Sequence, residues 1–171
     1  NAMPYLPGAI ESILNQTMND FELICLDDGS SDRSLATLRG YAMRDRRIRV
    51  ISRANAGVVI TTNELNAAAR AAYTARMDAD DTCDPTRLQK QADFLDAHQD
   101  VVAVSCAREQ TDPYGMVCQV SQPPGDHETI DAAMMRGRLD VFCHEYLLKN
   151  FREKFRLFEY WFNYERYKHL I

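Results

Sequence analysis

Apolar residues along the first two thirds of the chain alternate between two kinds of spacing. Stripes at i, i+3 and i+4, such as Ile10, Ile13 and Leu14, are typical of helices that cover a core, whereas short unbroken apolar runs are typical of buried strands. Helix and strand alternate from the start, which predicts an α/β fold with a mostly parallel sheet and helices on both faces. The expected helices lie near residues 10–14 and 35–41, from just after the loop at 53–57 to residue 72, and near 85–95, and the expected strands at 21–26, 48–51, 73–77 and 101–106.

The alternation ends after residue 106. Residues 112–115, Asp-Pro-Tyr-Gly, form a turn signal, and residues 116–120 are expected to return antiparallel. A helix over 127–136 and a last strand over 139–144 should follow. The aromatic-rich end, residues 155–171, has the spacing of a helix that packs on the core, with a nucleic-acid stacking platform as the alternative.

Length, charge, apolar runs and cysteine spacing narrow the classes of protein to which the chain can belong. A chain of 171 residues is expected to form one domain with a real core. The net charge of -5 leaves no basic surplus to neutralise a phosphate backbone, which argues against a general nucleic-acid binder. No apolar run approaches the roughly 20 residues that span a bilayer. The five cysteines are widely spaced and lack a C-x-x-C pair, which favours free thiols in a reducing compartment, the cytoplasm.

Three carboxylates, Asp78, Asp80 and Asp81, follow the expected strand at residues 73–77. Open α/β sheets bind their ligands at the carboxyl ends of strands. Asp78 and Asp80 are two residues apart, so in extended backbone they point to the same side. Hard divalent cations take such oxygens, and magnesium commonly completes its shell with phosphates and water. A solvated acidic turn with Asp84 as helix N-cap is the alternative, and on these residues alone both interpretations stay open.

A second acidic loop, residues 27–32, closes the strand at 21–26. An Asx-turn with favourable charge at the start of a helix explains Asp27 and Asp28 without any ligand. With their flanks, however, the two loops closely resemble the family 2 glycosyltransferases of the GT-A fold. The match is dense over about residues 4–106 and thin beyond. The matching stretches are residues 9–17, 20–23, 27–32, 47–51 and 76–81, and residues 85–88 fit the segment that follows.

The resemblance implies one GT-A domain over residues 1–171. About residues 4–106 would form a Rossmann-like nucleotide-sugar-binding part, and about residues 107–171 a small antiparallel acceptor-side part. It implies inverting transfer of a sugar from a nucleotide-diphospho-sugar, with a UDP-sugar favoured, to an acceptor hydroxyl, assisted by Mn²⁺ or Mg²⁺. The implied acceptor is a glycan, lipid-linked or cell-surface polysaccharide. The implied location is the cytoplasm or the inner face of the membrane. Whether the protein forms an oligomer is left open.

The resemblance also implies roles for the acidic residues. Asp80 matches the family's metal-ligating aspartate, with Asp78 in support. Asp28 matches the aspartate that accepts a hydrogen bond from the nucleobase, and Asp27 shapes the same loop.

Four polar or small residues complete the implied site. Asn55 and Gly57 match a loop near the nucleotide, where glycine lets the backbone approach a ligand. Asn63 matches a residue on the following helix, with a solvated helix position as the alternative. His144 falls where the family often has an acceptor-side histidine, with a core histidine as the alternative.

The chain departs from the family pattern in three places. The family opens with a buried strand before the position of Pro4 and has Gly-Glu where this chain has Ala71-Ala72. Its general base is an aspartate in a Glu-Asp pair ahead of a tryptophan, and aligning Trp161 with that tryptophan leaves Glu159 beside an absent pair. The base is therefore unassigned, and binding without normal turnover is predicted.

Two other functions remain as alternatives. A non-catalytic or truncated GT-A module that binds a nucleotide or a partner protein ranks second. A nucleotidyltransferase ranks last, because the chain lacks a glycine-rich, basic phosphate loop.

Overall fold

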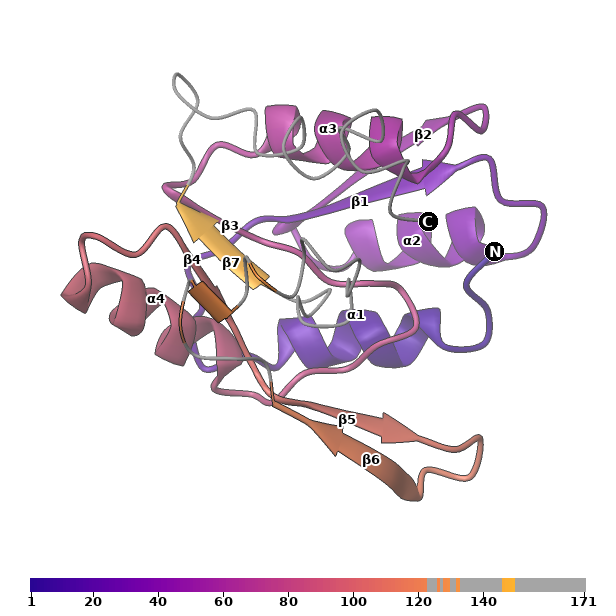
Figure 1. Ribbon diagram of the computed structural model, residues 1–171. Coiled ribbons are helices and arrows are strands. Elements are labelled where there is room, and N and C mark those ends of the chain that lie inside the picture. Colours follow the sequence, from indigo (N-terminus) through magenta and orange to yellow (C-terminus); the bar gives the residue numbers. More distant parts are fainter. Residues whose placement is uncertain (123–125, 127, 130–131, 133–145, 150–171) are drawn as a thin grey trace.

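A computed structural model describes residues 1–122, 126, 128–129, 132 and 146–149 (Figure 1). Helices and strands alternate over the first part of the chain, as the apolar pattern predicts. They are α1 (Leu6–Leu14), β1 (Leu23–Asp28), α2 (Ser34–Ala42), β2 (Ile48–Arg53), α3 (Val58–Ala68), β3 (Tyr73–Ala75), α4 (Arg87–Ala97) and β4 (Ala103–Ser105). The strands β5 (Arg108–Thr111), β6 (Val117–Ser121) and β7 (Tyr146–Lys149) follow.

Parallel pairing is confirmed for the first two strands. β1 and β2 pair in parallel, with Leu23 opposite Ile48 and Asp28 opposite Arg53. β3 and β4 both pair antiparallel with β7, which lies between them, so they run parallel to each other without sharing hydrogen bonds. β5 and β6 form the predicted antiparallel return, which projects from the body of the molecule in Figure 1.

The predicted apolar stripes form the core. Leu6 and Ile10 of α1 pack with Leu38 of α2 and Ile48 of β2, all nearly inaccessible to solvent. α3 lies on the opposite side of β1 from α1 and α2 (Figure 1), so helices cover both faces of the β1–β2 pair. A second cluster forms where Leu95 of α4 packs near Tyr73 and Val104. Within the described residues, no helix has the length and apolar content to cross a bilayer.

Several element boundaries differ from the predictions. α3 begins at Val58 and ends at Ala68, before the expected residue 72, because Ala69 is extended. The Arg70 amide and guanidinium then bind the Glu22 carboxylate at 3.0 and 2.7 Å, which draws the chain off the helix. The expected strands at 73–77 and 101–106 are likewise shorter, at Tyr73–Ala75 and Ala103–Ser105.

The start of α4 corrects the interpretation of Asp84. The N-cap of α4 is Thr86, so Pro85 lies outside the helix. The Asp84 carboxylate accepts the Thr86 amide at 2.8 Å and closes a turn ahead of the helix. Almost all of the expected helix at 127–136, and all of the strand at 139–144, the aromatic helix, His144, Glu159 and Trp161, lie outside the described residues.

Candidate functional site

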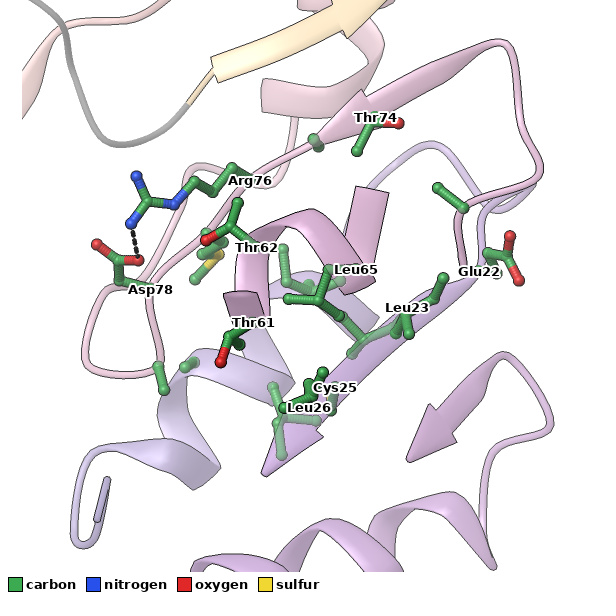
Figure 2. Close-up of a pocket in the computed structure, with 18 of the residues that line it drawn as sticks. Glu22, Leu23, Cys25, Leu26, Thr61, Thr62, Leu65, Thr74, Arg76 and Asp78 are labelled. Atoms are coloured by element: carbon green, nitrogen blue, oxygen red, sulfur yellow. Dashed lines mark hydrogen bonds and ion pairs between the residues drawn. The ribbon is translucent and has the colours of Figure 1, made fainter. Parts of the chain in front are cut away.

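A cavity of about 650 Å³ opens between β1 and β3 (Figure 2). Among the described strands, β1 pairs only with β2 and β3 only with β7, so the two edges that face the cavity are not bonded to each other. Leu23, Leu26 and Leu65 give its body an apolar lining. Cys25, a free thiol as predicted, lies there too, and burial raises its pKa to about 11. Polar side chains from the strand ends, from the loops that follow them and from α3 also line the cavity: Asp27, Asp28, Asn55, Thr61, Arg76 and Asp78.

Asp27 holds the turn that follows β1. Its side chain is only 4% exposed. One carboxylate oxygen accepts the Ser30 amide at 3.3 Å and the other accepts the Ser52 hydroxyl at 3.4 Å. Gly29 makes the turn possible with a φ of +79°, and a Cβ there would lie 2.9 Å from the Asn55 amide nitrogen. The two loops that follow β1 and β2 are therefore in direct contact.

Asp28 binds the start of α3. Its two carboxylate oxygens accept the amides of Ala56 at 2.9 Å and Gly57 at 3.0 Å, and the Arg53 guanidinium pairs with one of them. The Asn55 side chain donates to the Asp28 carbonyl at 3.0 Å. Gly57, with a φ of +90°, is the N-cap residue of α3. Asp28 therefore places its charge at the start of a helix, as the ligand-free interpretation expected. The helix is α3, which follows the neighbouring strand β2, and not α2, which follows Asp28 in the chain.

These donors lower the pKa of the Asp28 carboxyl below its usual value. The Ala56 amide has the largest effect, partial burial opposes it, and the Gly57 amide and the Arg53 charge lower the pKa further. The stabilisation is therefore complete above the ordinary aspartate pKa of about 3.9 and is lost as the pH falls through the lower folded-state pKa.

We expect Asp28→Asn to flatten the pH dependence of stability. An amide cannot titrate, so the free energy of unfolding of the variant should fall less steeply than that of the native protein between about pH 5 and pH 2. Urea denaturation at a series of pH values measures both curves. Parallel curves over this range would show that the Asp28 interactions do not contribute to acid sensitivity.

In the acidic loop after β3, the Asp78 and Asp80 carboxylates differ in whether they line the cavity. Asp78 lines the cavity and pairs with Arg76 at 2.9 Å, drawn as a dashed line in Figure 2. Asp80 is exposed in the turn, where the Asp81 amide donates to the Asp78 carbonyl at 3.4 Å. No group of three potential metal-ligating side chains gathers within the part of the chain that the structure describes. A divalent cation held by these two carboxylates would therefore complete its shell with ligand oxygens or water, as magnesium commonly does.

Asn63 lies apart from the other expected site residues. It is exposed on α3 and does not line the cavity, whereas its neighbours Thr61 and Thr62 do. This position is the solvated one that was the alternative for Asn63.

Three residues with a part in the site were not identified from the sequence. Arg53 pairs with Asp28, and its guanidinium also donates to the Thr61 hydroxyl at 2.9 Å. Arg76 pairs with Asp78. A basic residue at or beside the end of a strand, close to an acidic loop, is a signal that the sequence does carry for both arginines.

A sequence model described as "Glycosyl transferase family 2" matches residues 1–155. The uncharacterised glycosyltransferase EpsJ of Bacillus subtilis is 35% identical over 113 residues, which are 66% of this chain and 33% of EpsJ. A chondroitin synthase of Escherichia coli is 34% identical over 89 residues, 52% of this chain and 13% of the synthase. The chain thus spans a third or less of the length of these relatives.

Two solved structures have a similar fold. The mannosyltransferase PcManGT of Pyrobaculum calidifontis, in complex with GDP-Man and Mn²⁺, superposes with a TM-score of 0.57 at 22% identity, covering 67% of this chain and 33% of that one. Residues 1–349 of TarS from S. aureus superpose with a TM-score of 0.63 at 17% identity, covering 88% of this chain and 44% of that one. At these identities the likeness establishes the shared GT-A fold.

Proposed function

Because the chain belongs to glycosyltransferase family 2, we propose that it is the donor-binding part of a glycosyltransferase. The enzyme would transfer a sugar from a nucleotide-diphospho-sugar to an acceptor hydroxyl, with inversion. The observation that supports this proposal most is that Asp27 and Asp28, at the end of β1, and Asp78, after β3, line one cavity. Asp27 is already committed to its turn. The other carboxylates can serve a ligand that carries both a base and a diphosphate.

In this proposal Asp80 and Asp78 hold a divalent cation, Mn²⁺ or Mg²⁺. The donor set fits, because both are carboxylates in one turn, and such oxygens suit these hard cations. The Mn²⁺ in the PcManGT complex supports the same choice. When bound, the cation neutralises charge on the departing diphosphate. The part of this chain is to hold Asp78 at the cavity and Asp80 in the adjoining turn.

Asp28 receives the base in this proposal. An ionised carboxylate has about four acceptor sites, and three are taken by Ala56, Gly57 and Arg53. The Thr61 hydroxyl also hydrogen-bonds to this carboxylate. In this proposal the imide N–H of a uracil base, from a UDP-sugar, takes the acceptor site that the hydroxyl uses in the ligand-free chain. Asn55 and Gly57 hold the loop against Asp28. The GDP-Man in PcManGT makes guanine the competing base.

Most of the expected acceptor-side part, about residues 107–171, lies outside the described residues, and the general base is unassigned. A glycan, lipid-linked or cell-surface polysaccharide remains the proposed acceptor, since a chondroitin synthase is among the relatives. Binding without normal turnover stays a prediction, because the Glu-Asp pair is absent near Trp161.

A thermal-shift screen tests the proposed donor and cation together. UDP-sugars and GDP-sugars are each added with and without Mn²⁺. We expect stabilisation by UDP-sugars in the presence of Mn²⁺ and little without it. A larger shift with GDP-sugars would change the base, and no shift with any sugar nucleotide would refute the donor site.

We expect Asp28→Ala to weaken nucleotide binding about ten- to a hundredfold, because a buried base donor would lose its acceptor. The Mn²⁺ concentration for half-maximal effect should stay unchanged. Calorimetry at saturating Mn²⁺ measures the first quantity and a Mn²⁺ titration measures the second. Equal losses in both would show that the roles of the two acidic loops are assigned wrongly.

Glu64→Gln is the matched control for this variant. Glu64 pairs with Arg53, so its loss disturbs the same charge network, yet it does not line the cavity. Nucleotide affinity should therefore be retained.

A further inference from the structure

Arg76 and Asp78 form an ion pair at the edge of the cavity. The Arg76 guanidinium reaches the Asp78 carboxylate at 2.9 Å, and the two side chains are 22% and 36% exposed. Figure 2 shows the guanidinium directed at the carboxylate, and both residues line the cavity. One of the two carboxylates proposed for the cation therefore already has a positive partner in the ligand-free chain.

The main chain and the side chain of Arg76 have different partners. Arg87, which is only 5% exposed at the start of α4, donates to the Arg76 carbonyl at 3.0 Å. The backbone of Arg76 is thus tied to α4. Its guanidinium, by contrast, is partly exposed and pairs with Asp78, so both the carboxylate and its partner are accessible to a ligand in the cavity.

A cation on Asp78 and the guanidinium on Asp78 exclude each other. Two positive charges on one carboxylate repel each other strongly even at an effective dielectric constant near 20. A nucleoside diphosphate brings new negative charge to the same place. Guanidinium binds phosphate oxygens through two parallel hydrogen bonds, which an ammonium group cannot do.

We propose that Arg76 is an exchangeable counter-ion: it neutralises Asp78 in the ligand-free chain, is displaced by the divalent cation, and then binds the diphosphate of the donor. This inference rests on the proposed function. It makes binding of the free cation weak and binding of the cation together with the diphosphate strong. The chain would therefore take up the two as a unit.

The exchange predicts opposite effects from one substitution. Arg76→Gln should tighten the binding of Mn²⁺ alone by about fivefold or more, because Asp78 no longer has a competing partner. The same variant should bind UDP at saturating Mn²⁺ about tenfold more weakly, because a charge-assisted contact is lost. Arg76→Lys keeps the charge but not the two parallel hydrogen-bond donors. Its affinities for Mn²⁺ and for UDP should lie between those of the native protein and those of Arg76→Gln. Paramagnetic water relaxation measures free Mn²⁺ binding, and calorimetry measures UDP.

Arg70→Gln is the matched control. It removes the same charge and also breaks an ion pair, with Glu22, but the Arg70 side chain does not line the cavity. Both affinities should match those of the native protein. If Arg76→Gln lowers both affinities or leaves both unchanged while the native protein binds Mn²⁺ and UDP, then Arg76 only supports the loop and the exchange is refuted. If the native protein binds neither, the proposed function itself fails.

Discussion

Replacing Asp80 with asparagine should abolish the stabilisation that UDP gives in the presence of Mn²⁺. At ligand concentrations 100 times the dissociation constant, binding stabilises the folded state by about 2.7 kcal/mol. For a chain of this size that is a rise in Tm of roughly 5–11 °C. The variant should show only the small shift seen without the cation, because an amide oxygen is a far weaker ligand than a carboxylate for a hard cation.

The neighbouring carboxylate provides the control for Asp80. Asp81→Asn changes the same charge in the same turn and should keep the cation-dependent shift. Calorimetry of UDP with Mn²⁺ gives the affinity directly. An unchanged affinity in Asp80→Asn would remove Asp80 from the metal site, and a loss in Asp81→Asn alone would move the site by one residue.

Replacing Gly29 with alanine should cost roughly 2–4 kcal/mol of folding free energy. Two effects add. The φ of +79° is unfavourable for any residue with a Cβ, and the new Cβ would lie 2.9 Å from the Asn55 backbone nitrogen. The loop after β1 would have to separate from the loop after β2, which carries the amides that bind Asp28. The midpoint of urea denaturation measures the loss.

Two other glycines allow the cost of the backbone conformation at Gly29 to be measured separately from the cost of the steric clash with Asn55. Gly57 has a φ of +90° and a ψ of 163°, but no atom lies within 4 Å of where its Cβ would be, so Gly57→Ala should cost only the conformational term of about 1–3 kcal/mol. Gly40 lies inside α2 with open space around it, and Gly40→Ala should stabilise by about 0.5–1 kcal/mol. Equal losses at Gly29 and Gly57 would show that the contact with Asn55 relaxes freely.

The fold was predictable where local pattern decides it. Ile10 and Leu38 lie on helical stripes and are buried as expected. The end of α3 was not predictable, because alanines continue past Ala68 and the stop comes from Glu22, which lies 48 positions before its partner Arg70. The position of β7 between β3 and β4 is equally a matter of long-range pairing, which no local signal encodes.

The candidate site was predictable in composition but not in connectivity. The acidic loops at Asp28 and Asp78 lie at one cavity, as expected for carboxyl ends of neighbouring strands. The partners of these carboxylates were not predictable, because Arg53 and the Ala56 amide reach Asp28 across the sheet. The opening strand of the family pattern has no counterpart among the described residues. The sequence did not predict that a cavity would lie between β1 and β3.

The position of β7 has a consequence for how the chain folds. Tyr73 pairs with Lys149, and Ala103 pairs with Leu148, so among the described strands β3 and β4 are joined through β7, which lies far along the chain. Contacts between such distant residues slow folding, because the loop must be closed before any pairing energy is gained. During synthesis at about 5–20 residues per second, β3 and β4 wait for seconds before their common partner is made. Over that interval a nascent chain presents two open strand edges to the chaperones and to its neighbours.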